Sequence, residues 1–185
     1  MPDSDDTPTR LAILPDWNEG VRLVEEFDSN ASRSFAGKEQ RSAKRTRPKY
    51  RLEYIRSGLI AAEAKRRLIE IRLEFEGPLI VPIWPDGTVL QEAMSVQTSA
   101  LLDTNIPDEY STPFDVYLWT PDIGGEFRTV TSNSSRTLTL SGSGTLYPTG
   151  AFIFPCKRAT REIDFDAIDS IDIETGTEKV RFLTL

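Results

Sequence analysis

Five carboxylates near the end of the sequence come closest to a set of side chains that could do chemistry. They are Asp164, Asp166, Asp169, Asp172 and Glu174. Several carboxylate oxygens can bind Ca²⁺, and two carboxylates at a set separation can hydrolyse a glycosidic bond. The run has neither the central glycine nor the twelfth-position glutamate of an EF-hand loop. A chain with 29 acidic residues also offers many carboxylate pairs by chance.

Apolar residues alternate with most of these acids. The interleaved residues are Ile163, Phe165, Ile171 and Ile173. Such alternation is typical of strands that bury one face and expose the other to water. We therefore interpret the acidic run as a solvated strand face, and we predict neither a metal site nor a catalytic pair there.

The side chains that most enzymes use for proton transfer and nucleophilic attack are scarce. The chain has no histidine and one cysteine, Cys156. Without histidine, it cannot build a Ser-His or Cys-His mechanism by itself. One thiol can neither form an internal disulfide nor supply a zinc site. Cys156 follows the apolar run 151–155, which is typical of a half-buried thiol at a strand end. We expect no catalytic residues, no cofactor and no metal.

Length and charge narrow the class of protein further. The chain has 185 residues and a net charge of −7, which suits one soluble domain and argues against general binding of nucleic acid. No apolar run approaches the ~20 residues of a membrane span. The polar, acidic residues 1–10 differ from a secretory signal and predict a flexible N-terminal arm. The lack of disulfides fits folding in a reducing cytosol.

Positive charge is concentrated in one segment. Twelve of the 22 Lys and Arg residues lie between Arg33 and Arg67, with three acids among them. This segment could bind phosphate, with Tyr50 and Tyr54 as stacking platforms, or it could be a solvated strand face. We favour a subunit interface, because unlike charged patches on identical chains dock head to tail and close into rings.

Two sets of residues follow from the interface hypothesis. The candidates on the basic side are Gly37, Lys38, Gln40, Arg41, Lys44, Arg45 and Arg47. The candidates for the acidic counter-surface are Asp164, Asp166, Asp169 and Asp172.

Hydrophobic periodicity predicts a mainly β chain with one prominent α-helix. Short alternating runs separated by Gly, Pro, Asn and Asp predict many strands, among them 79–84, 94–102, 114–119, 151–154 and 180–185. Before these strands, a helical stripe of Ala61, Ala64, Leu68, Ile71 and Phe75 predicts a helix near 59–76, which Gly77 and Pro78 end. The expected fold is a β-sandwich or barrel plus an extended basic loop or hairpin, with residues 11–185 in a single domain.

Three tryptophans each lie near a Pro-Asp dipeptide. Trp17, Trp84 and Trp119 could stack on a sugar or a base, but aromatic rings that cap the ends of a β-core are the commoner arrangement. A binding module that uses Trp84 and Trp119 for carbohydrate stays open as an alternative.

Several motifs between residues 15 and 85 resemble those of a known family. They are Pro15-Asp16-Trp17, the stretch 34–41 (Ser-Phe-Ala-Gly-Lys-Glu-Gln-Arg), the stretch 45–50 (Arg-Thr-Arg-Pro-Lys-Tyr) and the stretch 77–84 (Gly-Pro-Leu-Ile-Val-Pro-Ile-Trp). In this order, with a strand after the first motif and a Leu/Tyr strand and a helix before the last, they are similar to tail-tip and distal tail proteins of long-tailed bacteriophages.

The resemblance implies a virion structural protein that is not an enzyme. It implies a tail-tube-like sandwich or barrel flanked by one helix, and a homo-oligomeric ring, expected to be a hexamer, at the distal tail. The ring would join the tail tube to the tip hub and let DNA pass through its bore, with no membrane and no specific nucleic-acid binding. The protein would be made in the host cytoplasm and reside in the virion tail. Alternatives are a non-enzymatic β-sandwich module for carbohydrate or a tail fibre, and a hydrolase that uses only carboxylates.

Overall fold

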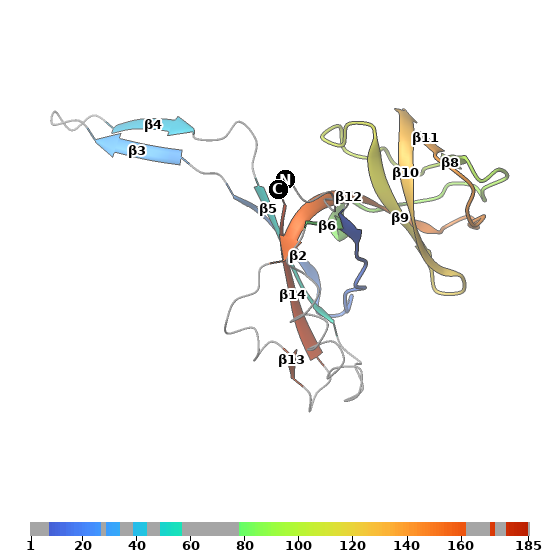
Figure 1. Ribbon diagram of the computed structural model, residues 1–185, viewed down its shortest axis with the longest axis horizontal. Coiled ribbons are helices and arrows are strands. Elements are labelled where there is room, and N and C mark those ends of the chain that lie inside the picture. Colours follow the sequence, from blue (N-terminus) through green and yellow to red (C-terminus); the bar gives the residue numbers. More distant parts are fainter. Residues whose placement is uncertain are drawn as a thin grey trace, which may run out of the picture. The chain divides into compact units, whose positions relative to one another are not determined.

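The computed structural model describes residues 8–26, 29–33, 39–43, 49–56, 78–161, 171–172 and 177–184 (Figure 1). The chain divides into two compact units, which are described separately. The first comprises Met1–Leu14 and Glu70–Ala159, and the second comprises Pro15–Ile69 and Thr160–Leu185. Residues 1–7 of the expected N-terminal arm lie outside the described residues, and the single domain over 11–185 stays a prediction.

The first unit contains a closed antiparallel barrel. Its strands are β7 (Thr88–Val89), β8 (Ser99–Leu101), β9 (Phe114–Thr120), β10 (Gly124–Ser134), β11 (Thr137–Leu140) and β12 (Phe152–Arg161). The ladder runs β12-β9-β10-β11-β8, and β7 pairs with β12. A bridge between Leu90 and Leu102 then joins the ends of β7 and β8. It is flanked by hydrogen bonds from Asp103 N to Val89 O and from Gln91 N to Leu101 O, both 2.9 Å. Closure leaves the barrel without a free strand edge in this ladder.

Alternating strand residues supply the core of this unit. In β11 the sequence Thr-Leu-Thr-Leu places Leu138 and Leu140 inside and both threonines outside. Leu118 of β9 and Ile153 of β12 are paired and fully buried. Period-two alternation is what allows a strand to bury one face, and burying a leucine or isoleucine side chain contributes roughly 1.5–3 kcal/mol.

β12 continues beyond the barrel and makes a second set of pairs. Residues Cys156–Ala159 pair with β6 (Leu79–Pro82), and β1 (Thr9–Arg10) pairs with β6 in parallel. The 3₁₀ turn η1 (Trp84–Asp86) joins β6 to β7, and its Trp84 is buried. Pro85 within this turn fits the fixed φ of proline at the start of a helical turn.

The second unit is built around one long hairpin. β2 (Val21–Glu26) and β5 (Lys49–Arg56) pair from Val21–Tyr54 to Glu26–Lys49. Between β2 and β5 in the sequence, the chain forms a second antiparallel pair, β3 (Ser29–Arg33) with β4 (Glu39–Ala43). β5 also pairs with β14 (Thr177–Thr184), and β13 (Ile171–Asp172) pairs with β14. In β5, Leu52 and Tyr54 are buried and their neighbours in sequence are only half-buried.

The prediction of a prominent α-helix is wrong for the structure as described. The described residues are mainly strand, with no helix of seven or more residues; η1 is their one helical element. The segment expected to be helical, 59–76, itself lies outside the described residues. Helical periodicity is a weak determinant, because such a helix is stabilised mainly by packing of its apolar face. The barrel core is instead supplied by strands and their connecting loops.

Candidate functional site

The basic candidates lie on the β3–β4 hairpin or in segments beside it. Gln40 and Arg41 belong to β4, where their partners in β3 are Ser32 and Ala31. Arg33 ends β3 opposite Glu39. The remaining candidates, Gly37, Lys38, Lys44, Arg45 and Arg47, lie outside the described residues. The backbone therefore brings two of the seven candidates onto one hairpin strand.

This hairpin has an unusual composition for a sheet. β3 reads Ser-Asn-Ala-Ser-Arg and β4 reads Glu-Gln-Arg-Ser-Ala, so alanine is the largest apolar residue. The two strands form a two-stranded sheet of their own. Two-stranded hairpins without an apolar face are marginally stable in water. The β3–β4 hairpin is therefore a candidate for an element that a binding partner stabilises.

The acidic candidates are only partly described. Asp172 lies in β13, paired with Thr177 of β14, whereas Asp164, Asp166 and Asp169 lie outside the described residues. Within the described ranges, no group of three or more Cys, Asp or Glu side chains is arranged to hold a metal ion.

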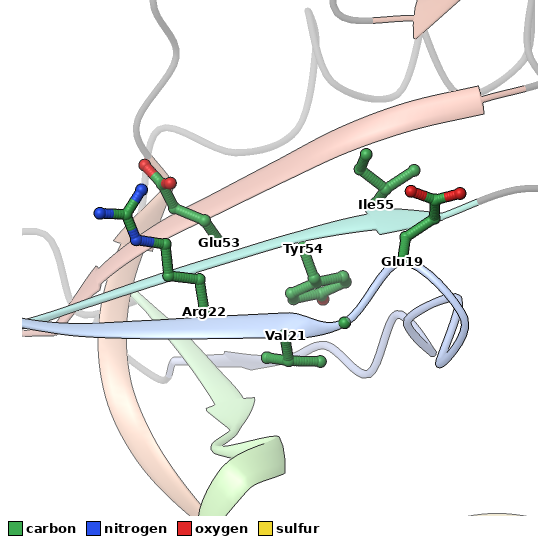
Figure 2. A pocket seen from close by; sticks show the side chains of 7 residues that line it. Glu19, Val21, Arg22, Glu53, Tyr54 and Ile55 are labelled. Atoms are coloured by element: carbon green, nitrogen blue, oxygen red, sulfur yellow. The ribbon is translucent and has the colours of Figure 1, made fainter.

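A shallow pocket of about 250 Å³ lies where β2 begins, and sequence reasoning missed it (Figure 2). Arg22 and Glu53 are direct cross-strand partners, and their side chains extend on the same side of the two strands, while Glu19 stands at the other end. Gly20 lies between Glu19 and Val21 with a φ of 78°, a left-handed conformation that favours glycine. The pocket is assembled by β2–β5 register, so no local sequence motif could have marked it.

Two cross-strand rows, made of five aromatic residues and one glycine, lie on one face of β12, β9 and β10. The first row is Phe152, Trp119 and Gly125, and the second is Phe154, Tyr117 and Phe127. Trp84 covers the second row, with edge contacts to Phe154 at 4.7 Å and to Tyr117 at 6.0 Å between ring centroids. The first row is open to solvent, because Phe152 is 41% exposed and Trp119 is half-buried.

The two tryptophans of the carbohydrate alternative therefore differ. Trp84 is 3% exposed, and the Tyr117 and Phe154 rings pack on it as part of the core. This agrees with the favoured interpretation of a core-capping ring and removes Trp84 from the carbohydrate alternative. Trp119 stays accessible beside Phe152, at 5.9 Å between ring centroids.

Cys156 is buried, and the pKa of its thiol is raised well above the usual value by burial and by the nearby Asp115 carboxylate. The thiol points to the carbonyl oxygen of Phe154 at 3.7 Å. A protonated, buried thiol is a poor nucleophile. Cys156 lies within β12 and is buried, whereas the sequence predicted a half-buried or strand-end thiol.

Tyr110 belongs to a polar cluster that holds a loop against η1. Its hydroxyl donates to Asp86 Oδ2 at 2.6 Å, and burial together with this bond raises its pKa. Lys157 donates to Glu109 at 2.6 Å and lies over the Tyr110 ring. The cluster is satisfied internally, so it stabilises the loop before β9.

Arg128 is the buried cation of the described chain, and sequence reasoning missed it as well. Its guanidinium donates to the carbonyl oxygens of Ser141, Gln97 and Gly142 and to Glu126 Oε1. Glu126 in turn accepts hydrogen bonds from the backbone and hydroxyl of Thr145. The arrangement ties the 141–145 loop to β10. An arginine in an alternating strand normally indicates the solvated face, so the pattern gave no signal.

Comparison with known proteins adds no relative. No protein-family model matches the chain, and no curated protein matches it. Among the described residues, no helix is both long enough and apolar enough to span a membrane.

Proposed function

We propose that the protein is a structural component of a bacteriophage tail. It forms a homo-oligomeric ring, expected to be hexameric, at the distal end of the tail, joins the tail tube to the tip and lets DNA pass. The resemblance over residues 15–85 supports this proposal, and so does the polarised charge of the chain.

The β3–β4 hairpin is the observation that carries the proposal. Its strands are polar, and among the described strands they pair with each other alone. The sequence after β4 is rich in Lys and Arg. Ordering such a hairpin costs conformational entropy that no apolar burial of its own offsets. Contact with an acidic surface of a neighbouring subunit supplies the missing stabilisation, since Arg pairs with carboxylates in a bidentate geometry that fixes register.

Electron microscopy and sedimentation test the proposal directly. Negative-stain images of the purified protein or of virions should show six-fold rings. Raising the ionic strength to about 1 M shortens the screening length to roughly 3 Å, so ring association should weaken. Two results together would contradict the proposal: purified protein that stays monomeric at all concentrations, and virions that contain no ring of this chain.

Charge reversal in the basic segment should weaken association. For the double variant Arg41→Glu/Arg45→Glu we expect at least tenfold weaker self-association by analytical ultracentrifugation. The variant replaces two Arg–carboxylate pairs between subunits, each worth about 0.2–1 kcal/mol, by repulsion between carboxylates. The matched control is Arg22→Glu/Arg136→Glu, which changes net charge equally at two exposed arginines. Equal loss in both variants would show that net charge, and not the hairpin, controls association.

A non-enzymatic binding module is the second candidate function. The accessible Trp119 beside Phe152 favours it, while the burial of Trp84 removes half of the platform first expected. Such a module would act as an adaptor for a carbohydrate or a tail fibre.

A further inference from the structure

We propose that the outer face of β9, β10 and β12 holds a saccharide-binding site, in which Trp119 and Phe152 stack on a sugar ring and the Tyr117 hydroxyl bonds to it. This site rests on the second candidate function, the binding module, and gives it a ligand class. All of its residues belong to the first unit, and none belongs to the basic hairpin.

Register places an aromatic platform at this surface. Phe152 of β12 is paired with Trp119 of β9, and Trp119 is paired with Gly125 of β10. The Trp119 and Phe152 rings are inclined by 39°. Phe152 is also nearly parallel to the buried Phe154, with an interplanar angle of 7°. Phe152 is thus packed between the Trp119 and Phe154 rings, and a platform that is held in place binds a ligand at a lower entropic cost.

Gly125 makes room for the Tyr117 side chain at this surface. It is exposed and has no side chain of its own beside its cross-strand partner Trp119. A Cβ at this position would collide with the hydroxyl end of Tyr117. The Tyr117 hydroxyl therefore lies directly over Gly125, beside Trp119. Any larger residue would displace it.

The Tyr117 hydroxyl is the polar group next to the platform. Tyr117 itself is 9% exposed, and its ring packs against Phe127 at 4.8 Å between ring centroids. A phenol hydroxyl both donates and accepts. A buried-edge hydroxyl next to two apolar rings matches a sugar, which presents C–H groups on its ring face and hydroxyls around its rim.

The chemistry of the surface favours a neutral saccharide over other ligands. The two rows contain no charged residue, whereas single-stranded nucleic acid needs cations along its backbone. The open row is also far smaller than the roughly 20–30 residues a side of a stable protein interface. A shallow site of this size supports Kd values on the order of 0.1–1 mM.

Titration with defined oligosaccharides tests the site. The probes are cellohexaose, maltohexaose, chitohexaose and a rhamnose oligosaccharide, with tryptophan fluorescence and calorimetry as readouts. Measurements in a Trp17→Phe background leave Trp119 as the exposed tryptophan, since Trp17 is 52% exposed and Trp84 is buried. We expect at least one probe to bind, with affinity unchanged by Trp17→Phe.

Substitutions in the two rows then decide whether the bound sugar occupies this site. Trp119→Ala should lower affinity at least tenfold, and Tyr117→Phe several-fold with the fold intact. Tyr117→Phe keeps the ring, so it decides the question if Trp119→Ala fails to fold. The proposal is overturned if no probe binds at millimolar concentration, if bound sugar is insensitive to both substitutions, or if Trp119→Ala instead dissociates a dimer.

Discussion

Replacing Arg128 by methionine should lower the free energy of unfolding by about 3–5 kcal/mol, because breaking a buried ion pair leaves the partner charge unpaired. The Arg128 side chain is 5% exposed and makes five hydrogen bonds, from 2.8 to 3.2 Å. Methionine preserves length and apolar bulk but donates nothing. The carbonyl oxygens of Ser141, Gln97 and Gly142 would lose their donor. Urea denaturation at neutral pH measures the effect.

Arg136 offers a matched control for Arg128. It is exposed, and its bond to the Asp103 carbonyl oxygen is long, at 3.5 Å. Arg136→Met should therefore change stability by less than about 0.5 kcal/mol. Gly144→Ala should destabilise as well, since the added Cβ would collide with the Arg128 guanidinium and the Glu126 carboxylate. A loss below about 1 kcal/mol in Arg128→Met would show that water replaces the guanidinium at these carbonyl groups.

Alkaline pH should destabilise the protein, with stability falling above about pH 8.5. Burial raises the pKa of the Cys156 thiol, and burial with the Asp86 hydrogen bond raises the pKa of Tyr110. Burial raises the pKa of Tyr147 to about 12. The folded state thus keeps protons that the unfolded chain releases.

The sign and size of this pH dependence follow from proton linkage. Each such group lowers stability by about 1.4 kcal/mol per pH unit above its unfolded pKa, near 8.5 for the thiol and 10 for tyrosine. By about pH 11 the three groups together remove on the order of 5 kcal/mol, a large part of a typical total. Urea midpoints across this pH range, with tyrosinate absorbance, measure the loss.

Two variants separate the contributions to alkaline unfolding. Cys156→Ala should move the onset of the decline from about pH 8.5 to about pH 10, because only the tyrosines then titrate. Tyr110→Phe should reduce the slope above about pH 10 while leaving the thiol-dependent part. A stability that stays constant up to about pH 11 would contradict the burial of these protons.

Strand positions were predictable wherever apolar and polar residues alternate. The runs 114–119 and 151–154 correspond to β9 and to the start of β12, and 79–84 corresponds to β6 followed by η1. In contrast, the run 94–102 forms a strand only at Ser99–Leu101. Its first residues are exposed apart from Met94. They form a loop, and Arg128 donates a hydrogen bond to the Gln97 carbonyl oxygen in it. Tertiary contacts there decide the conformation that propensity leaves open.

Candidate binding residues were less predictable than strands. Segregated charge marked the basic segment, and two of its residues lie on β4. The pocket at Glu19 gave no such signal, and in the row of Phe152, Trp119 and Gly125 the sequence pointed to Trp119 alone. Both depend on register between strands that are distant in the sequence, which local periodicity does not contain.

By itself the sequence determined the alternating strands, the scarcity of catalytic side chains and the concentration of positive charge before residue 67. Only the tertiary structure decided that the Leu90–Leu102 bridge closes a barrel, that Arg128 lies inside, and that Trp84 is buried while Trp119 is accessible. The physical reason is that alternation along the sequence shows which side chains lie on the same face of a strand. Which face is covered depends on pairing between remote segments.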